Sequence, residues 1–562
     1  MYTRFTRRAW LKLLGLATTN AFLVGCPTPR PDSEAINVLR ATDPKSRLTI
    51  DTHCHVFNGS DLPMAPFATK VLVHGKDFPK GLDQLAELVQ AIVWSNSPSA
   101  NEEIEVLNSI RGASVVDSRE LLRQTRQRAH ANAVGRMRDA AKSVREKVPE
   151  GLQTPTTDPY RALRDFSGSY ETDAWLEPTS ASAAESPVAG AASAAEAMGA
   201  LFFLAQLQNY RTCNVLSYLE SMSPAGVPSM DLIVPSLVDF DFWLTGADDS
   251  ATATSLTDQL RVMELLSVVS GGRVHALAPY DPLRDIVTNG ASLKLVQDHV
   301  RLHGFMGVKI YPPMGFGAAG NAGVTPNPWK CAQGLPPITQ QNDFPEKLDA
   351  AMARLLKWCC DEEVPVMAHT SSSNGQTDDL EKLAGPDHWL SALKDCPSLR
   401  IDFGHLGDTS LAEDGIDHAM EFAKLMGDGA SPGGHAFADT GYFDDAIDNS
   451  DGLSERLKQL FAKSSTIGSR LMYGTDWLMN CGVPGIDRYR ADFESLVASL
   501  ELSLSAHSPA YHGFAARFFG GNAATFYGLK KGGKTRARLE AFYAANNIKQ
   551  APSWMTKVDS VA

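Results

Sequence analysis

The chain has 562 residues, of which 43% are hydrophobic, 21% charged and 8% aromatic, a length typical of a few domains or one large barrel with additions. The composition excludes a disordered tail, a collagen-like repeat and a small disulfide scaffold, and a single apolar run of near-membrane size excludes a multi-span membrane protein. The net charge of −13, with no long Lys/Arg block, argues against a nucleic-acid partner and leaves a small-molecule substrate as the expected partner.

The first 25 residues are typical of an export signal. Residues 6–12 (TRRAWLK) resemble a twin-arginine signal, an apolar stretch follows, and residues 23–26 (LVGC) resemble a bacterial lipobox. We therefore expect cleavage before Cys26, lipidation of its thiol, and a periplasmic or cell-envelope location with membrane contact through this lipid only. A plain membrane anchor is the alternative, but the apolar run is shorter than the ~20 residues that a span needs. Removal of 1–25 leaves 48 Lys and Arg against 65 Asp and Glu, a charge of −17.

Seven cysteines remain once Cys26 is set aside, and none forms a CxxC pair or a zinc-finger pattern. Cys359 and Cys360 lie in a helical pattern, where we expect core positions. The sequence assigns no disulfide.

The rest of the chain divides by pattern. Residues 26–47, rich in Pro, Thr, Asp and Ser, are expected to be a tether, and 48–57 a first strand. Residues 58–230 are expected to form a mainly helical insertion, with helical patterns at 76–94, 101–115 and 117–148. A barrel remainder over 231–530 and a C-terminal helical tail over 531–562 complete the expected organisation.

From Asp231 onward, short apolar runs alternate with amphipathic helical patterns. The runs occupy 232–240, 273–280, 304–313, 364–370, 399–407, 434–441 and 469–477. With residues 48–57 they make eight strands, and continuous apolar strands alternating with helices indicate a parallel sheet covered by helices. Eight such units predict an α/β fold, a (β/α)8 TIM barrel with a large insertion after its first strand. A doubly wound open sheet is the alternative, but no Gly-rich phosphate loop follows the first strand.

Residue types that bind metals recur at the carboxyl ends of these strands. His53 and His55 are two apart on the first strand, so their side chains point to the same face. His369, His405 and Asp476 each follow a later apolar run. Taken singly, a histidine here could be a hydrogen-bonded core residue and Asp476 a helix N-cap. Together they predict a site where barrel enzymes place theirs, at the carboxyl ends of the strands.

This order of residues resembles the amidohydrolase superfamily. The segment 513–529 (GFAARFFGGNAATFYGL) resembles the end of its amidohydrolase-related (amidohydrolase 2) branch, and the resemblance covers 48–57 and 231–530. It implies a divalent metal, Zn²⁺ by expectation, held by His53, His55, His369 and Asp476. It also implies catalytic roles for His405, as base or substrate polariser, and for Asp476, as proton acceptor and donor. The implied reaction is attack of metal-activated water on an ester, lactone or amide carbonyl.

Three further residues are candidates for substrate binding: Lys309, Tyr311 and Trp477. For Lys309 three alternatives stand open: a substrate contact, a carboxylated bridge between two metal ions, or a side chain at the solvent-exposed rim. For Tyr311 and Trp477 a packing role is the alternative.

Two other functions compete with an exported metal-dependent hydrolase. One is a metal-dependent non-oxidative decarboxylase of an aromatic or unsaturated acid, an activity also found in this branch. The other is a cell-envelope binding or scaffold protein that uses the insertion over 58–230 to contact a partner.

Overall fold

The computed structural model describes most of the chain from residue 42 onward. The described residues are 39–40, 42–72, 82–112, 203, 206–223, 230–246, 252–332, 334–408, 414–427, 433–464 and 466–560. The expected signal over 1–25, most of the tether and the helical pattern at 117–148 lie outside them.

Eight parallel strands form the centre of the molecule. They are β1 (Ile50–Cys54), β2 (Leu232–Pro235), β3 (Leu277–Pro279), β4 (Gly307–Ile310), β5 (Val366–His369), β6 (Ile401–Gly404), β7 (Ala436–Asp439) and β8 (Leu471–Met472). β1 pairs with β2, and β3 to β8 pair in unbroken sequence order. All eight lie within the apolar runs that the sequence predicts as strands, and each is shorter than its run.

Bridges outside the named strands close the sheet into a barrel. Ile233 of β2 pairs with Val274 before β3, and Ser236 after β2 pairs with Leu277 of β3. Cys54 of β1 pairs with Trp477 after β8. The amide of Thr52 also donates to the carbonyl of Tyr473 at 3.0 Å. The fold is therefore the predicted (β/α)8 barrel.

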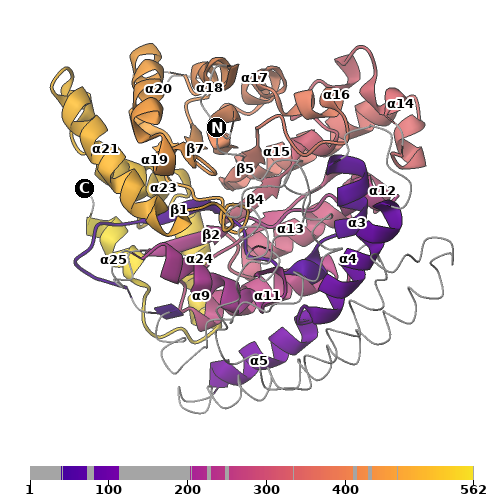
Figure 1. Cartoon of the computed structure of the whole chain (residues 1–562), viewed down its shortest axis with the longest axis horizontal. Coiled ribbons are helices and arrows are strands. Elements are labelled where there is room, and N and C mark those ends of the chain that lie inside the picture. The colour runs from indigo at the N-terminus through magenta and orange to yellow at the C-terminus, as the bar shows by residue number, and fades with distance from the viewer. Residues whose placement is uncertain are drawn as a thin grey trace, which may run out of the picture.

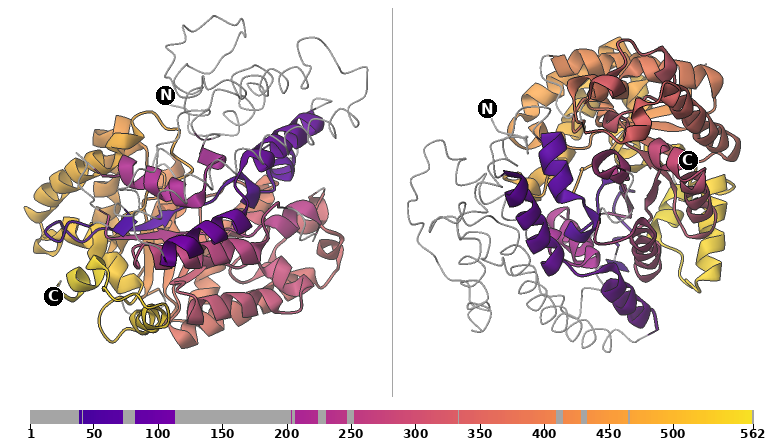
Figure 2. Two further views of the ribbon diagram at one scale, coloured as in Figure 1. Left: turned by 90° about the horizontal axis from the view of Figure 1, so that it is seen from below. Right: turned by 90° about the vertical axis from the view of Figure 1, so that its right-hand side faces the viewer.

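Helices surround the strands, as the right-hand view of Figure 2 shows. The longer ones are α11 (Leu256–Val269), α13 (Ala291–Leu302), α15 (Phe344–Glu362), α17 (Pro386–Asp395), α18 (Asp414–Leu425), α20 (Ser450–Lys463) and α21 (Tyr489–Ser505). The shorter ones are α10 (Asp241–Thr245), α12 (Pro282–Val287), α14 (Pro328–Cys331), α16 (Asp378–Glu381), α19 (Asp445–Asp448), α22 (Phe514–Ala516) and α23 (Asn522–Phe526). In α15, Leu348, Met352 and Leu355 recur at helical spacing and are fully buried, so this face packs on the barrel.

The described part of the insertion is helical. It contains α3 (Met64–Pro66), α4 (Leu82–Asn96), α5 (Ala100–Gly112) and α9 (Arg211–Ser221). The indigo helices α4 and α5 run along the outside of the barrel in Figure 1, and α5 packs on α11.

A buried ionic cluster holds the insertion together. Arg211 Nε donates to Asp61 Oδ2 at 2.7 Å and Arg211 Nη1 to Glu103 Oε2 at 3.0 Å. All three side chains are at most 4% exposed, so each charge depends on the others.

The C-terminal tail contains α24 (Lys534–Ala545) and α25 (Ser553–Ser560). Phe542 and Trp554 share one buried apolar cluster with Ile50 of β1, Leu277 of β3 and Met367 of β5. The tail therefore packs on the barrel. No helix within the described ranges has the length and apolar character needed to cross a membrane.

Candidate metal centre

The first strand delivers two imidazoles whose orientation is fixed by hydrogen bonds. His53 Nδ1 donates to the Asp439 carboxylate at 2.9 Å, and His55 Nδ1 donates to the carbonyl of Ser236 at 2.8 Å. Because each ring carries its hydrogen on Nδ1, each presents a lone pair at Nε2. The pairing of β1 with β2 shifts register between Asp51 and Cys54, an irregularity that often adjusts side chains near a site.

Asp476 completes this group from the segment after β8. Its Oδ1 lies 3.1 Å from His55 Nε2 and 3.4 Å from His53 Nε2. All three side chains are at most 9% exposed, and the three ligand atoms lie within 4.8 Å of one another. Asp476 also has a φ of 58°, a conformation that costs backbone energy and is frequent at functional sites.

These atoms fit a bound cation. Within the described chain, His53 Nε2 and Asp476 Oδ1 are buried and have no hydrogen-bond partner. A carboxylate oxygen and two imidazole lone pairs that converge without a shared hydrogen repel one another unless a proton or a metal ion lies between them. Two histidines and one carboxylate are a ligand set typical of catalytic Zn²⁺ with an open position.

The charge states of His53 and Asp476 suit the binding of a metal ion. Burial, together with the charges of Lys309 and His405, lowers the pKa of His53 well below its usual value, so the ring is neutral. Burial acts to raise the pKa of Asp476, but the nearby His53 and His55 outweigh it and lower the pKa, so the carboxylate is ionised. Metals bind these two forms.

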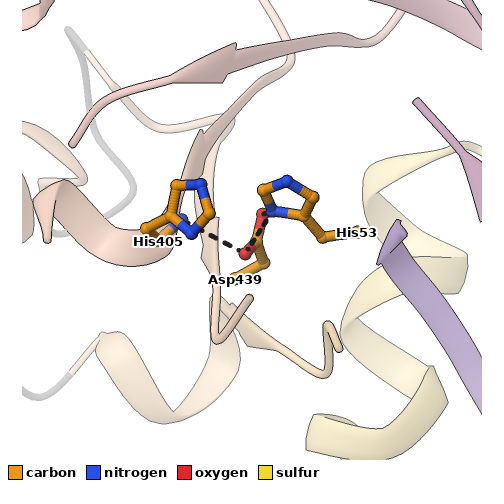
Figure 3. A group of neighbouring side chains, drawn as sticks. All are labelled: His53, His405 and Asp439. Atoms are coloured by element: carbon orange, nitrogen blue, oxygen red, sulfur yellow. Dashed lines mark hydrogen bonds and ion pairs between the residues drawn. The ribbon is translucent and has the colours of Figure 1, made fainter. Parts of the chain in front are cut away.

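Asp439, the last residue of β7, is a site residue that the sequence reasoning missed. Besides His53, it accepts hydrogen bonds from the amides of Gly441 at 2.7 Å and His405 at 3.2 Å. Figure 3 shows its carboxylate between the rings of His53 and His405. These three residues form a second cluster of metal-ligand type. The missed signal was positional, because Asp439 ends its strand as His369 ends β5.

His405 and His369 form a hydrogen-bonded pair. His405 Nδ1 donates to the carbonyl of Gly441 at 2.9 Å, so its Nε2 accepts from His369 Nδ1 at 3.1 Å. His369 Nε2 then accepts from the Ser373 hydroxyl at 3.1 Å. Among the described residues His369, an expected ligand, therefore lies outside the group of His53, His55 and Asp476. Its ring is 4.6 Å from that of His405, centre to centre.

Tyr311 lies against His369. The two rings stack with centroids 4.3 Å apart and an interplanar angle of 19°. The Tyr311 hydroxyl accepts from Asn374 Nδ2 at 2.9 Å, which ties it to the loop after β5. Phe240, 5.9 Å away between ring centroids, extends this aromatic surface.

Lys309 is inside the barrel, which rules out the rim alternative. It is 1% exposed, and its Nζ contacts Met367 Sδ at 3.6 Å. Burial lowers the pKa of Lys309 to about 8, while Asp439 and Asp476 act to raise it. The substrate-contact and carboxylated-bridge alternatives both remain compatible with this position.

Trp477 packs against Tyr218 of α9. It is fully buried, and its ring meets that of Tyr218 of α9 at 6.0 Å between centroids. Its backbone carbonyl accepts from the amide of His55. These contacts favour the packing alternative over the expected substrate contact.

Three glycines leave the space that His53 occupies. A Cβ at Gly441 would lie 2.6 Å from His53 Nδ1, and one at Gly474 would lie 2.8 Å from His53 Cβ. A Cβ at Gly404 would lie 3.3 Å from His53 Cε1. The β6, β7 and β8 ends must therefore lack side chains at these points for the ring to reach Asp439.

Structural comparisons return barrels of low similarity. An uncharacterised TIM-barrel protein from Bordetella bronchiseptica is 14% identical with a TM-score of 0.33, over 56% of this chain and 81% of its own. A zinc-bound amidohydrolase from Burkholderia multivorans is 13% identical with a TM-score of 0.32, over 53% and 83%. A proposed metal-dependent hydrolase from Lactobacillus casei is 12% identical with a TM-score of 0.34, over 86% and 95%. At these values we transfer no function from them.

No curated protein matches the chain. Residues 292–529, less than half of the chain, match the family model described as amidohydrolase. The matched part contains β4 to β8 and hence His369, His405, Asp439 and Asp476, but not His53 and His55. The chain from β4 to α23 is therefore similar to the amidohydrolases.

Proposed function

We propose that the chain is an exported metal-dependent hydrolase in which metal-activated water attacks an ester, lactone or amide carbonyl of a small organic substrate. The observation that carries this proposal is the convergence of three electron-pair donors. His53 Nε2 and Asp476 Oδ1 are buried without a hydrogen-bond partner among the described residues, and His55 Nε2 carries a lone pair because its Nδ1 donates to Ser236. The amidohydrolase match over 292–529 supports the same class of reaction.

In this proposal some site residues bind the metal ion and others transfer protons. His53, His55 and Asp476 would hold a divalent ion, Zn²⁺ by its ligand set, with His369 as the fourth ligand once its Nε2 leaves Ser373. Such an ion lowers the pKa of bound water toward ~7 and polarises a carbonyl. Asp476 would take a proton and return it to the leaving group, and His405 would polarise the substrate or act as base. Tyr311 would bind the substrate beside His369.

Metal content tests the site directly. Protein comprising residues 27–562 is expected to carry stoichiometric metal, and His55→Ala should lose most of it, because one of three convergent donors is gone. His507→Ala is the matched control, since His507 is exposed and bonded only to the Ser503 carbonyl among the described residues. A wild-type protein that neither carries metal nor responds to added Zn²⁺ would sink the proposal and favour a scaffold protein.

Substrate panels separate the reaction types. Turnover of lactones, esters or amides that depends on the metal is the expected result. Release of CO2 from aromatic or unsaturated acids, without hydrolysis, would instead identify a decarboxylase. Loss of activity on His405→Ala, with bound metal retained, would support the proton-transfer role of His405.

The export part of the proposal rests on the sequence of residues 1–26. Metabolic labelling with palmitate is expected to mark the wild-type protein and not Cys26→Ser. Replacing Arg7 and Arg8 with Lys should leave unprocessed precursor in the cytoplasm, whereas Arg4→Lys should be processed normally. Unlabelled, unprocessed wild-type protein would refute this part alone.

A further inference from the structure

Two thiols from separate helices meet at the amino-terminal side of β5 and β6. Cys360 lies near the end of α15, and Cys396 is the C-cap residue of α17, with its amide bonded to the Ala392 carbonyl at 2.9 Å. Both thiols are free, and Cys360 is near enough to Cys396 to influence the pKa of its thiol. The sequence gives no sign that Cys360 and Cys396 are neighbours, because they are 36 positions apart.

A tight turn places Cys396 against Cys360. The amide of Leu399 donates to the Cys396 carbonyl at 3.0 Å, which closes a four-residue turn with Pro397 at its second position, a placement that Pro favours. Ser398 of the same turn lies with its Oγ 2.9 Å from Cys360 Sγ. The turn that carries Cys396 is therefore in contact with the Cys360 side chain.

The barrel register explains why the two residues are neighbours. Val366 of β5 pairs with Ile401 of β6. Cys360 and Cys396 precede these paired residues by six and five positions, so adjacent parallel strands bring both to the same edge of the barrel.

Accessibility distinguishes this pair from Cys54, Cys359 and Cys481, which are buried. Cys360 and Cys396 are both partly exposed, which corrects the expected core position of Cys360. Cys359 is 1% exposed, and burial raises its pKa well above the usual value, so its thiol is inert. Burial and the neighbouring Cys360 raise the pKa of Cys396 to about 11, which disfavours its thiolate.

We propose that Cys360 and Cys396 form a disulfide that ties the end of α15 to the turn before β6. Cys360 attacks a small disulfide oxidant and releases one thiol, and Cys396 then attacks the mixed disulfide and releases the second. Two protein thiols thereby lose two hydrogens, and the oxidant is reduced to two thiols. An oxidising compartment of the kind proposed for this chain would maintain the bond.

The test uses the purified wild-type chain with oxidised glutathione as the oxidant. Alkylation of the remaining thiols, digestion and mass spectrometry should show the loss of two alkylatable thiols and a peptide containing Cys360 linked to one containing Cys396. Cys396→Ser should form no link and should stop at the mixed disulfide of Cys360 with glutathione. Cys359→Ser should still form the link, which separates Cys360 from its neighbour in the same peptide.

Two outcomes would overturn the proposal. One is a link that disappears in Cys359→Ser but persists in Cys360→Ser. The other is wild-type protein that keeps all its thiols after oxidation. A melting temperature that rises on oxidation of the wild type, but not of a folded Cys396→Ser variant, would support the bond as a structural link.

Discussion

Replacing Asp439 with Asn should weaken metal binding without disturbing the barrel. Asp439 Oδ1 and Oδ2 lie 2.9 and 3.1 Å from His53 Nδ1, and Oδ1 also accepts the Gly441 amide at 2.7 Å. An amide of the same shape can keep the bond to Gly441, but it loses the charge that holds the hydrogen on His53 Nδ1. Carboxylate partners of ligating histidines are worth ~10–100-fold in metal affinity, or about 1.4–2.7 kcal/mol.

The assay is a competition titration of Zn²⁺ against a chromophoric chelator at fixed neutral pH. Asp448→Asn is the matched control, because Asp448 is an exposed residue of α19 just beyond the same strand. The Asp439→Asn protein should unfold in urea near the wild-type midpoint and bind Zn²⁺ at least tenfold more weakly, the lower end of the range for such partners. An affinity equal to that of the control would refute the role of Asp439 in orienting His53.

Three further substitutions test other parts of the structure. Gly441→Ala should displace the His53 ring, because the new Cβ would lie 2.6 Å from His53 Nδ1, and the bound-metal content should fall; full metal occupancy would contradict the geometry. Burial lowers the pKa of His275 from its usual 6.5 to about 4. Between these two pH values the imidazole is protonated in the unfolded chain but not in the folded one, so the folded state loses stability as the pH falls. The loss should reach about 3 kcal/mol near pH 4, and urea titrations of His275→Gln should lack this component. Arg211→Ala should cost about 3–5 kcal/mol of unfolding free energy, because it leaves two buried carboxylates unpaired, and an unchanged urea midpoint would contradict this.

Local pattern was sufficient to predict the strands and the first candidate ligands. The strands are apolar runs of the length that buried parallel strands need, so their number and order were readable. His53, His55 and Asp476 follow or interrupt such runs, and their occurrence together at the carboxyl ends of strands pointed to a site. The sequence therefore indicated both the fold and three donors that the structure brings together.

The rest of the site depends on contacts that span hundreds of residues. Asp439 reads locally as a polar residue before a Thr-Gly turn, and only its pairing with His53, 386 positions away, distinguishes it. The burial of Lys309 depends on its register with Met367 of β5, not on its own segment. The orientation of His369 depends on the hydrogen bonds that its two ring nitrogens make with His405 and Ser373. Sequence spacing carries no information on these bonds.

The connection after β7 sets the hydrogen positions of two histidines at once. The Gly441 carbonyl accepts from His405 Nδ1, so the lone pair of that ring lies on Nε2. The Gly441 amide holds the Asp439 carboxylate, which keeps the hydrogen of His53 on Nδ1 and its lone pair on Nε2 as well. One lone pair faces Asp476 and the other faces His369, so the two backbone groups of one residue set the hydrogen positions of the proposed metal ligand His53 and of the proposed proton-transfer residue His405. Since a Cβ at this position would collide with His53, the same residue must supply both backbone groups and the space between them, which only glycine does.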